Sequence, residues 1–477
     1  MGTDGWLSDR HRTAIGRSSL SMPARQALLD GILRPELTAL DYGCGRGDDV
    51  ARLAHLGMTV TGWDPQHGGV RPDKPHDVVA LTYVINVIED PAERQTVLSD
   101  AWSLTERCLV VSSRLAWERK QVAGTSLGDG TLTSRNTFQR LFSPAELRAL
   151  VERATGVRAI SPVPGVVYAF RSDEDRLAYL ARRASPDQAW QEGTDTGSAI
   201  AAVVDFLKRR GRMPMVEETP EALLPLLTNL TWRQLSRLAT EAADPEHVAE
   251  GRKQSILNVL LLLGIEVFNG RSRLHSLPLP VQADICAFFE SYKEACRRAD
   301  RLLMKLRDDT YLRNVMRNSV GKMTPTAIYV HRRATDRMPV LLKLYEHCGA
   351  VAAGRPTNWD IIKLAHEGRS VSWLGYPEFD QDAHPRLAWS YNVDMRSLEG
   401  SYRSYADSDN RPLLHRKHEF LAADDPYASK YRRLTDREVR AELYAQPHLI
   451  GNERGWESAL QAAGVRLVGH RLVRDRS

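Results

Sequence analysis

The sequence predicts an α/β fold at the N-terminus, followed by a helical domain and a mixed α/β C-terminal domain. Two observations predict the first part: apolar runs of strand length alternate with helical patterns, and a glycine-rich turn follows one such run at residues 43–47. A third observation, almost continuous helical patterning from residue 198 onward, sets the second domain apart. We expect domains at 1–185, 198–350 and 355–477, with a polar linker at 184–197.

The run LDYGCGRGDD, residues 40–49, gives the strongest local signal. An apolar strand ends in a carboxylate at Asp41. Three glycines follow at alternate positions, Gly43, Gly45 and Gly47. Glycine is needed there because the backbone must turn sharply and approach a ligand where a Cβ atom would collide. A second strand ends in Asp64 about twenty residues later, which is typical of a Rossmann-like sheet that holds an adenosine cofactor.

These side chains favour S-adenosylmethionine as the cofactor. Asp41 can hold an ammonium group, the glycine loop accommodates the ligand backbone, and Asp64 can accept hydrogen bonds from ribose hydroxyls. A pyrophosphate cofactor such as NAD prefers GxGxxG opening directly into a helix N-terminus. Here the spacing is GxGxG, and Asp48 and Asp49 would repel a pyrophosphate where the helix begins. The alternative is a glycine-rich turn in an unrelated α/β domain.

Further elements extend the N-terminal sheet. Residues 51–57 have helical spacing and end in glycine, and residues 77–81, DVVAL, form the continuous apolar run of a buried parallel strand. Residues 108–112 supply another strand, and residues 165–170 close the sheet. Only residues 66–76 separate the second strand from DVVAL, which is too short for the usual helix and strand. The wall on the adenine side must therefore come from elsewhere or be missing.

Two polar residues follow DVVAL, at the sheet edge where open α/β proteins bind substrates. Methyl transfer needs the acceptor in line with the sulfonium and a nearby base or dipole, so Tyr83 and Asn86 are the candidate catalytic residues. Alternatively, both side chains only pack against the cofactor. The strand is not followed by the Asp-Pro-Pro-aromatic motif of amino-methylating DNA enzymes, and the absence of a Pro-Cys pair argues against cytosine C5 methylation.

Several runs together resemble the DNA phosphorothioation-associated methyltransferase family. They are HRTAIGRSSLSMP at 11–23, LDYGCGRGDDV at 40–50, GWDP at 62–65, DVVALTYVINVIEDPAER at 77–94, GDGTLTSRNTFQR at 128–140, KMTPTAIYVH at 322–331 and LLHRKHEF at 413–420. The resemblance covers nearly the whole chain. It implies a class I methyltransferase sheet, a place in bacterial DNA-modification or defence gene clusters, and a methyltransferase role that is predicted rather than demonstrated. It implies no substrate.

Basic residues are concentrated in one stretch. Residues 251–350 hold 17 lysines and arginines against 9 aspartates and glutamates, whereas the whole chain carries a net charge of +5. Arg297, Arg298 and Arg301 fall on one predicted helix, 281–307, and such a helix can track phosphates. Joined to the resemblance, this predicts a nucleic-acid partner, DNA rather than RNA. The alternative is a solvated amphipathic face, partly neutralised by acidic neighbours.

Two C-terminal runs alternate polar residues: Asp380, Asp382 and His384, and then His415, Lys417 and Glu419. On a strand each set would share one face and could bind a metal or act as acid and base. Neither run has the fuller ligand spacing of known metal sites, so loop polar groups or ion pairs are the alternative and no metal is assigned.

The composition is that of a cytoplasmic enzyme without a membrane partner. Five scattered cysteines form no CxxC, and there is no apolar run of membrane-spanning length and no secretory leader. We therefore expect a methyltransferase that acts on nucleic acid, with other proteins of a DNA-modification cluster as further partners. Two alternatives stay open: a non-catalytic nucleic-acid-binding or regulatory subunit that retains the cofactor pocket, and a small-molecule or protein methyltransferase.

Overall fold

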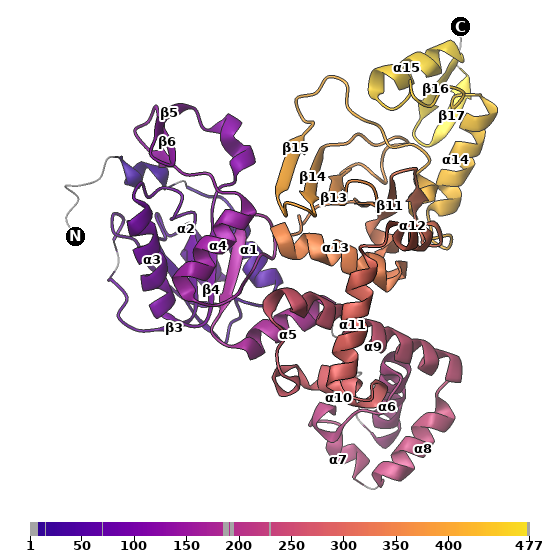
Figure 1. Cartoon of the computed structure of the whole chain (residues 1–477), viewed down its shortest axis with the longest axis horizontal. Coiled ribbons are helices and arrows are strands. Elements are labelled where there is room, and N and C mark those ends of the chain that lie inside the picture. Colours follow the sequence, from indigo (N-terminus) through magenta and orange to yellow (C-terminus); the bar gives the residue numbers. More distant parts are fainter. Residues whose placement is uncertain are drawn as a thin grey trace. The chain divides into compact units, whose positions relative to one another are not determined.

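The computed structural model describes residues 8–14, 16–68, 70–184, 190, 195–228 and 230–474. Packing divides the chain into two compact units (Figure 1). The sheet unit combines Met1–Arg171 with Asp309–Ser477, and the helical unit is Ser172–Asp308. The helical unit is thus inserted between the two halves of the sheet unit. Most of the expected linker, 185–189 and 191–194, lies outside the described residues.

The first half of the sheet unit holds the predicted Rossmann-like sheet. Its strand order is β2-β1-β3-β4-β9-β8, with β2, β1, β3 and β4 parallel and β9 antiparallel to both of its neighbours. The strands are β1 (Thr38–Tyr42), β2 (Thr59–Trp63), β3 (His76–Thr82), β4 (Thr105–Ser112), β8 (Ala159–Ile160) and β9 (Val166–Phe170). Residues 165–170 therefore do not close the sheet, because β8 pairs with the outer side of β9 and forms the edge.

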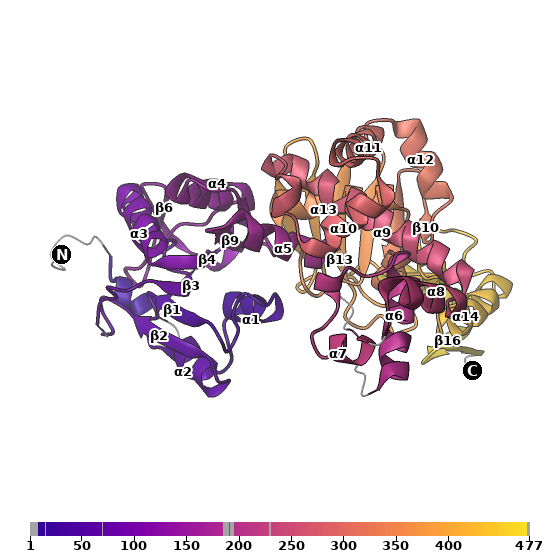
Figure 2. The ribbon, with the colours of Figure 1, turned by 90° about the horizontal axis from the view of Figure 1, so that it is seen from below.

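Helices cover both faces of this sheet (Figure 2). Val79 and Leu81 of β3 pack with Leu98 and Leu147 on one face, whereas Val78 faces the other side. Burial on both faces explains why β3 reads as a continuous apolar run. The helices of the first half are α1 (Met22–Leu29), α2 (Asp48–His55), α3 (Pro91–Ser103) and α4 (Pro144–Thr155), with 3-10 turns η1 (Arg10–Thr13) and η2 (Ala116–Gln121). A small sheet of β5 (Gly124–Leu127), β6 (Gly130–Thr133) and β7 (Phe138–Gln139) follows β4.

The second half of the sheet unit is an antiparallel meander with strand order β10-β11-β12-β13-β14-β15. Helix α13 (Val340–Ala353) packs on one face, where Gly349 lies against Val371 and Tyr391 donates a hydrogen bond to the Ala353 carbonyl. The strands are β10 (Lys322–Met323), β11 (Ala327–His331), β12 (Ile361–Ala365), β13 (Ser370–Gly375), β14 (Trp389–Asp394) and β15 (Gly400–Ser404). The remaining elements are α12 (Asp309–Arg317), η6 (Arg332–Arg337), η7 (Lys417–Phe420), α14 (Ala428–Arg440), α15 (Glu453–Ala462), β16 (Val465–Val468) and β17 (Arg471–Arg474).

The helical unit has its own core, in which α6, α8 and the residues around α7 pack together. Its helices are α5 (Asp173–Ala184), α6 (Thr196–Arg210), α7 (Leu224–Leu227), α8 (Trp232–Ala242), α9 (Pro245–Glu266), α10 (Leu279–Phe288) and α11 (Tyr292–Lys305), with 3-10 turns η3 (Val216–Glu218), η4 (Val267–Asn269) and η5 (Leu274–Ser276). The predicted single helix 281–307 is wrong. It breaks after α10, because the Ser291 side chain caps a new helix by accepting the Glu294 N–H.

The packing units differ from the domain boundaries expected from the sequence. Helix α5 belongs to the helical unit, although we placed residues up to 185 in the first domain. Residues 309–350 belong to the sheet unit, because β10 and β11 pair into the meander and α13 packs on it. Helical periodicity alone could not reveal that residues 309–350 include a helix, α13, that packs on a sheet. Among the described residues, none of the helices combines the length and apolarity needed to cross a membrane.

Candidate cofactor site

The glycine loop after β1 has the geometry that its sequence predicts. Gly43, Gly45 and Gly47 have φ angles of 88°, 54° and 76°, a region that side chains rarely adopt. A Cβ atom on Gly43 would lie 2.5 Å from Cγ2 of Val84, and one on Gly45 would lie 3.1 Å from Cβ of Ala14. The loop is therefore packed closely between the segment after β3 and the chain before α1. Gly47 caps α2, which begins at Asp48 as expected.

Asp41 is a buried carboxyl group that forms no ion pair at contact distance among the described residues, although the Arg17 charge acts on it. Its side chain stands at the end of β1, the residue is 5% exposed, and Oδ1 has no hydrogen-bond partner among the described residues. Burial, followed by the charges of Asp49 and Asp64, raises the pKa of Asp41 to about 7, and the charge of Arg17 offsets only part of this rise. A buried carboxylate in this position costs free energy unless a positive group joins it. An ammonium group at hydrogen-bonding distance from the unpartnered oxygen would therefore stabilise the ionised form of Asp41.

Asp64 lies at the bridge that follows β2 and is already hydrogen-bonded. Its Oδ2 accepts from the Gly45 N–H at 3.0 Å, and its Oδ1 accepts from the N–H groups of Gln66 at 2.8 Å and His67 at 3.0 Å. The His67 ring lies 3.1 Å from the same oxygen. Burial raises the pKa of Asp64, but these hydrogen bonds outweigh it and lower the pKa overall. A carboxylate offers about four acceptor positions, so a ribose hydroxyl has to displace a donor, and the His67 ring is the movable one.

The chain before α1 lies against the glycine loop, which the sequence did not reveal. The Arg17 N–H donates to Asp48 Oδ2 at 2.6 Å, and the Ser21 N–H donates to Asp49 Oδ1 at 2.8 Å. The Arg17 guanidinium lies 5.3 Å from the centre of the Tyr83 ring. The two aspartates that we interpreted as repelling a pyrophosphate therefore also hold this N-terminal segment. The two adjacent aspartates after the glycine loop were the sequence feature that could have indicated this contact.

Tyr83 and Asn86, the candidate catalytic residues, differ in their surroundings. Tyr83 directly follows β3 with a φ of 57°, a strained conformation for an aromatic residue, and its N–H donates to the Ser112 carbonyl at 3.1 Å. Asn86 is 2% exposed and donates from Nδ2 to Oε1 of Gln139 at 3.2 Å, while its Oδ1 lacks a partner among the described residues. A catalytic role stays a prediction for both.

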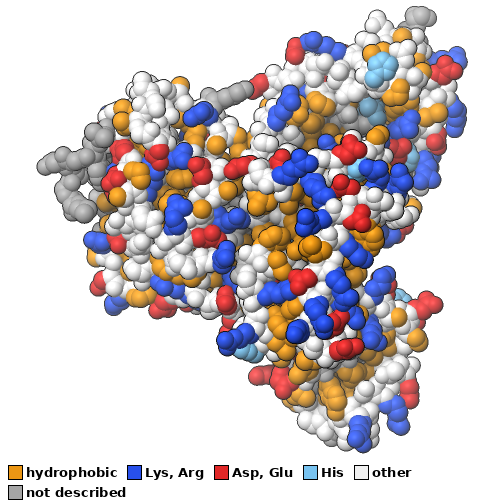
Figure 3. Space-filling view, viewed as in Figure 1, with side chains coloured by type: hydrophobic (Ala, Val, Ile, Leu, Met, Phe, Trp, Pro, Cys, Tyr) orange, Lys and Arg blue, Asp and Glu red, His pale blue; other side chains and the backbone are white. Residues whose placement is uncertain are grey.

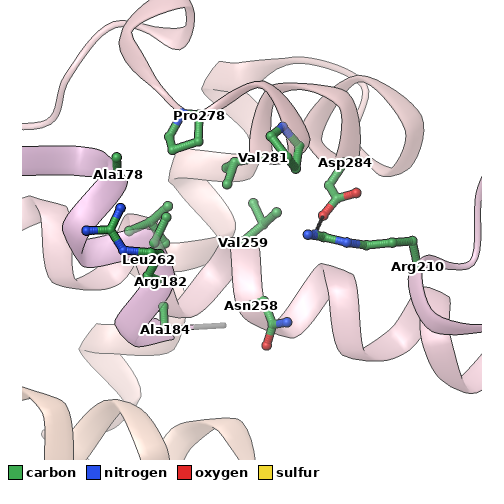
Figure 4. Close-up of a pocket in the computed structure, with 12 residues that line it drawn as sticks. Ala178, Arg182, Ala184, Arg210, Asn258, Val259, Leu262, Pro278, Val281 and Asp284 are labelled. Carbon is green, nitrogen blue, oxygen red and sulfur yellow. Dashed lines mark hydrogen bonds and ion pairs between the residues drawn. The ribbon is translucent and has the colours of Figure 1, made fainter. Parts of the chain in front are cut away.

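A cavity of about 20 Å³ lies beside Asp41 on the face covered by α1 and α2. It is far smaller than ligand pockets, which span roughly 300–1,000 Å³, and it is not the cofactor pocket. The helical unit contains another cavity, of about 120 Å³, whose lining is mainly apolar (Figure 4). The Arg210–Asp284 ion pair, 2.9 Å long, lies on one side of it and Arg182 on the other. No site residue predicted from the sequence lines this second cavity.

The predicted nucleic-acid contacts, Arg297, Arg298 and Arg301, are exposed on α11, where Figure 3 shows basic side chains. All three converge on Glu294, at 3.0, 3.2 and 2.9 Å respectively. The hydrogen bond from Arg298, with the charges of the other two, lowers the pKa of Glu294. The cluster therefore has a net positive charge, but each arginine already contacts a carboxylate.

The strand arrangement considered for the two C-terminal runs is wrong, because neither run lies on a strand. His384 pairs with the buried Glu438 at 2.7 Å, and Lys417 donates to the Phe379 carbonyl at 2.6 Å. Asp380 pairs with Arg333 at 2.9 Å. Within the described ranges, no group of three histidine, cysteine or acidic side chains has an arrangement that could hold a metal ion. These residues act as ion pairs and hydrogen-bonding groups of the second half of the sheet unit.

No family model matches the chain, and no curated protein matches it. Among solved structures, it is similar to magnesium protoporphyrin IX methyltransferase from Synechocystis PCC 6803, with 19% identity over 34% of this chain and 94% of that chain and a TM-score of 0.24. It is also similar to the CcbJ methyltransferase from Streptomyces caelestis, with 16% identity over 35% of this chain and 96% of that chain and a TM-score of 0.26. At these scores we take neither an activity nor a substrate from the likeness.

Proposed function

We propose that this chain is an S-adenosylmethionine-dependent methyltransferase that acts on nucleic acid, in the setting of bacterial DNA modification that the sequence resemblance implies. The observation that carries the cofactor is Asp41, a buried carboxyl group with an unpartnered oxygen at the edge of a Rossmann-like sheet. The residues fit the cofactor, because Asp41 offers an anion for its ammonium group and the glycine loop offers a turn without side chains.

The bound cofactor would supply an electrophilic methyl group on a sulfonium. Asp41 holds the amino group in its ionised form, and Asp64 accepts a ribose hydroxyl once the His67 ring has moved. The Tyr83 backbone, fixed by Ser112, sets the position of the aromatic ring, whose centre lies 5.3 Å from the Arg17 guanidinium. Positioning of the reactants contributes strongly to the rate of such a transfer, so we assign these residues an orienting role toward the cofactor.

Calorimetry with S-adenosylmethionine and with its demethylated product tests the cofactor. Asp64→Ala removes the ribose acceptor and Gly45→Leu places a side chain in the loop, so each variant should bind at least about tenfold more weakly, since losing a charged hydrogen bond costs roughly 1.5–3 kcal/mol. Asp73→Ala is the matched control, because Asp73 is exposed in the same β2–β3 connection. Unchanged affinity in both site variants would disprove the assignment.

The nucleic-acid acceptor rests on the sequence resemblance and on the positive α11 cluster. Turnover of labelled cofactor over a panel of DNA, tRNA, small molecules and proteins tests it. Methyl transfer to DNA supports the proposal. Binding of cofactor and DNA without transfer favours the non-catalytic regulatory subunit. Transfer to a protein or small molecule, together with negligible DNA affinity at low salt, favours the second alternative.

A further inference from the structure

Helix α14 carries a row of four basic residues that the sequence analysis did not single out: Lys430, Arg433, Arg437 and Arg440. All four are exposed. Their spacing of three, four and three residues places them within roughly 80° of one another around the helix and over about 15 Å of its length. They therefore form one continuous stripe, which we call the α14 stripe.

The opposite side of α14 is anchored in the sheet unit. Tyr431, Leu434 and Glu438 are buried, and Glu438 is hydrogen-bonded to His384 and Tyr444. Strand β17 packs beside α14 and adds the exposed Arg471 and Arg474. The α14 stripe thus lies on a fixed helix, with two further cations on a neighbouring strand.

The four cations of the stripe lack the ion pairs that many other arginines of this chain form. Among the described residues, none of its four cations forms an ion pair with a carboxylate. Lys430 lies 5.8 Å from the centre of the Tyr431 ring, and its charge also acts on Lys417 and His470. On α11, by contrast, three arginines share Glu294. Asp436 lies at the border of the stripe and is the one exposed acid within α14.

Repulsion between the like charges of the stripe destabilises α14 in the isolated protein. Like charges at i,i+3 and i,i+4 destabilise a helix by about 0.2–0.5 kcal/mol per pair. The helix dipole favours cations in the last turn, which suits Arg437 and Arg440, but it gives no such support to Lys430 and Arg433 in the first half. A polyanion that lies along the stripe would remove the repulsion.

We infer that the α14 stripe binds the phosphate backbone of duplex nucleic acid. This inference rests on the nucleic-acid part of the proposed function and adds a binding surface to it. A membrane fits less well, because membrane-bound amphipathic helices insert their apolar side, and the apolar side of α14 is buried in the protein. The stripe belongs to the same compact unit as the glycine loop, unlike α11.

Salt-dependent binding of a labelled duplex DNA of about 20 base pairs tests the stripe, because each lost phosphate contact lowers the slope of log affinity against log salt by about 0.9. Arg433→Gln should lower the slope by up to that amount, and the triple variant K430Q/R433Q/R437Q by up to about 2.7. Arg432→Gln is the matched control. Arg432 is exposed on the same helix but faces η7, where its charge acts on His418, so the slope should stay at the wild-type value.

The outcomes separate this inference from the proposed function. A smaller slope for Arg433→Gln but not for Arg432→Gln supports the stripe. Wild-type binding with an unchanged slope in the triple variant overturns the stripe and leaves the proposed function standing. Absence of duplex binding by the wild type at low salt overturns both the stripe and the nucleic-acid acceptor. Binding of anionic lipid vesicles in place of DNA also overturns the inference. Since all substituted side chains are exposed, circular dichroism should stay unchanged.

Discussion

The two large sheets of this protein each bury a carboxylate, and they treat it in opposite ways. In the Rossmann-like sheet, Asp41 has an oxygen without a hydrogen-bond partner among the described residues, and burial raises its pKa to about 7. Beneath the antiparallel meander, Glu346 of α13 accepts hydrogen bonds from Arg355 at 2.6 Å and from the Trp373 indole at 3.1 Å, with His347 at 3.1 Å. Burial raises the pKa of Glu346, but the Arg355 charge and its neighbours outweigh it and hold the pKa well below its usual value.

The difference separates a buried acid with a structural role from one that a ligand could neutralise. A buried charge that its own protein satisfies stabilises one packing arrangement, and removing a partner exposes its desolvation cost. A buried acid that the protein leaves unsatisfied lowers stability, and a ligand of opposite charge can recover the loss. On this argument we expect Glu346 to have a structural role and Asp41 to be neutralised by a ligand.

The largest expected effect is on stability at Glu346. Arg355→Ala leaves the buried carboxylate with too few partners, so the free energy of unfolding should fall by about 3–5 kcal/mol. Urea denaturation measures it. Adding Glu346→Gln to that variant should recover part of the loss, because the charge is then gone. If the double variant is no more stable than Arg355→Ala, the unpaired charge of Glu346 is not the cause of the lost stability.

Removing the charge of Asp41 should weaken ligand binding rather than lower the stability of the fold. Asp41→Asn removes a buried charge, so the ligand-free protein should be at least as stable as the wild type near pH 8. Its affinity for S-adenosylmethionine should fall at least tenfold, since a charge-assisted hydrogen bond is worth roughly 1.5–3 kcal/mol. Calorimetry and denaturation on the same preparations test both halves. If Asp41→Asn is strongly destabilised but binds the cofactor normally, Asp41 has a structural role like that of Glu346.

The two acids should also give opposite pH dependences. The folded pKa of Asp41 is raised from 3.8 to about 7, so the ionised form is disfavoured by folding and stability should fall as pH rises between these values, by up to about 1.4 kcal/mol per pH unit. Glu346 has a lowered folded pKa, so its contribution is present above its ordinary pKa and is lost as pH falls.

Cofactor affinity should therefore rise with pH up to about 7, because the ammonium group needs ionised Asp41. Denaturation of wild type and Asp41→Asn at several pH values gives the stability difference, and calorimetry below pH 7 should detect proton release on binding. A flat difference between the two proteins from pH 5 to 8 would argue against the raised pKa.

The smallest expected effect compares one glycine from each sheet. Gly47 and Gly368 have φ angles of 76° and 75°, and a Cβ atom on either would meet nothing within 4 Å. Alanine at either position should therefore cost about 1 kcal/mol through backbone strain alone. Only Gly47→Ala should also weaken cofactor binding. Equal binding by both variants would indicate that the loop conformation at Gly47 does not matter to the ligand.

The sequence predicted the glycine loop, the parallel strands and the short β2–β3 connection, because each depends on residues that are close in the chain. It could not predict that His67 and the Gly45 N–H occupy Asp64, or that the N-terminal segment contacts Asp48 and Asp49, since those contacts depend on tertiary folding. It also did not show that residues 309–350 pack with the meander, because β12, which pairs with β11, lies farther along the chain. The spacing of the four basic residues of the α14 stripe is visible in the sequence. That these residues form no ion pairs among the described residues is visible only in the structure.

The insertion of the helical unit has a consequence for synthesis on the ribosome. Residues 172–308 are complete before the second half of the sheet unit has emerged, so the first half has to wait with its contact surface bare. That surface includes Trp117, whose ring later lies 5.4 Å from that of Tyr391, and Arg148, which later donates to the Val351 carbonyl at 2.7 Å. Premature release of a truncated chain would therefore expose the Trp117 ring and its surroundings, and such fragments should be recognised by chaperones more strongly than the full-length protein.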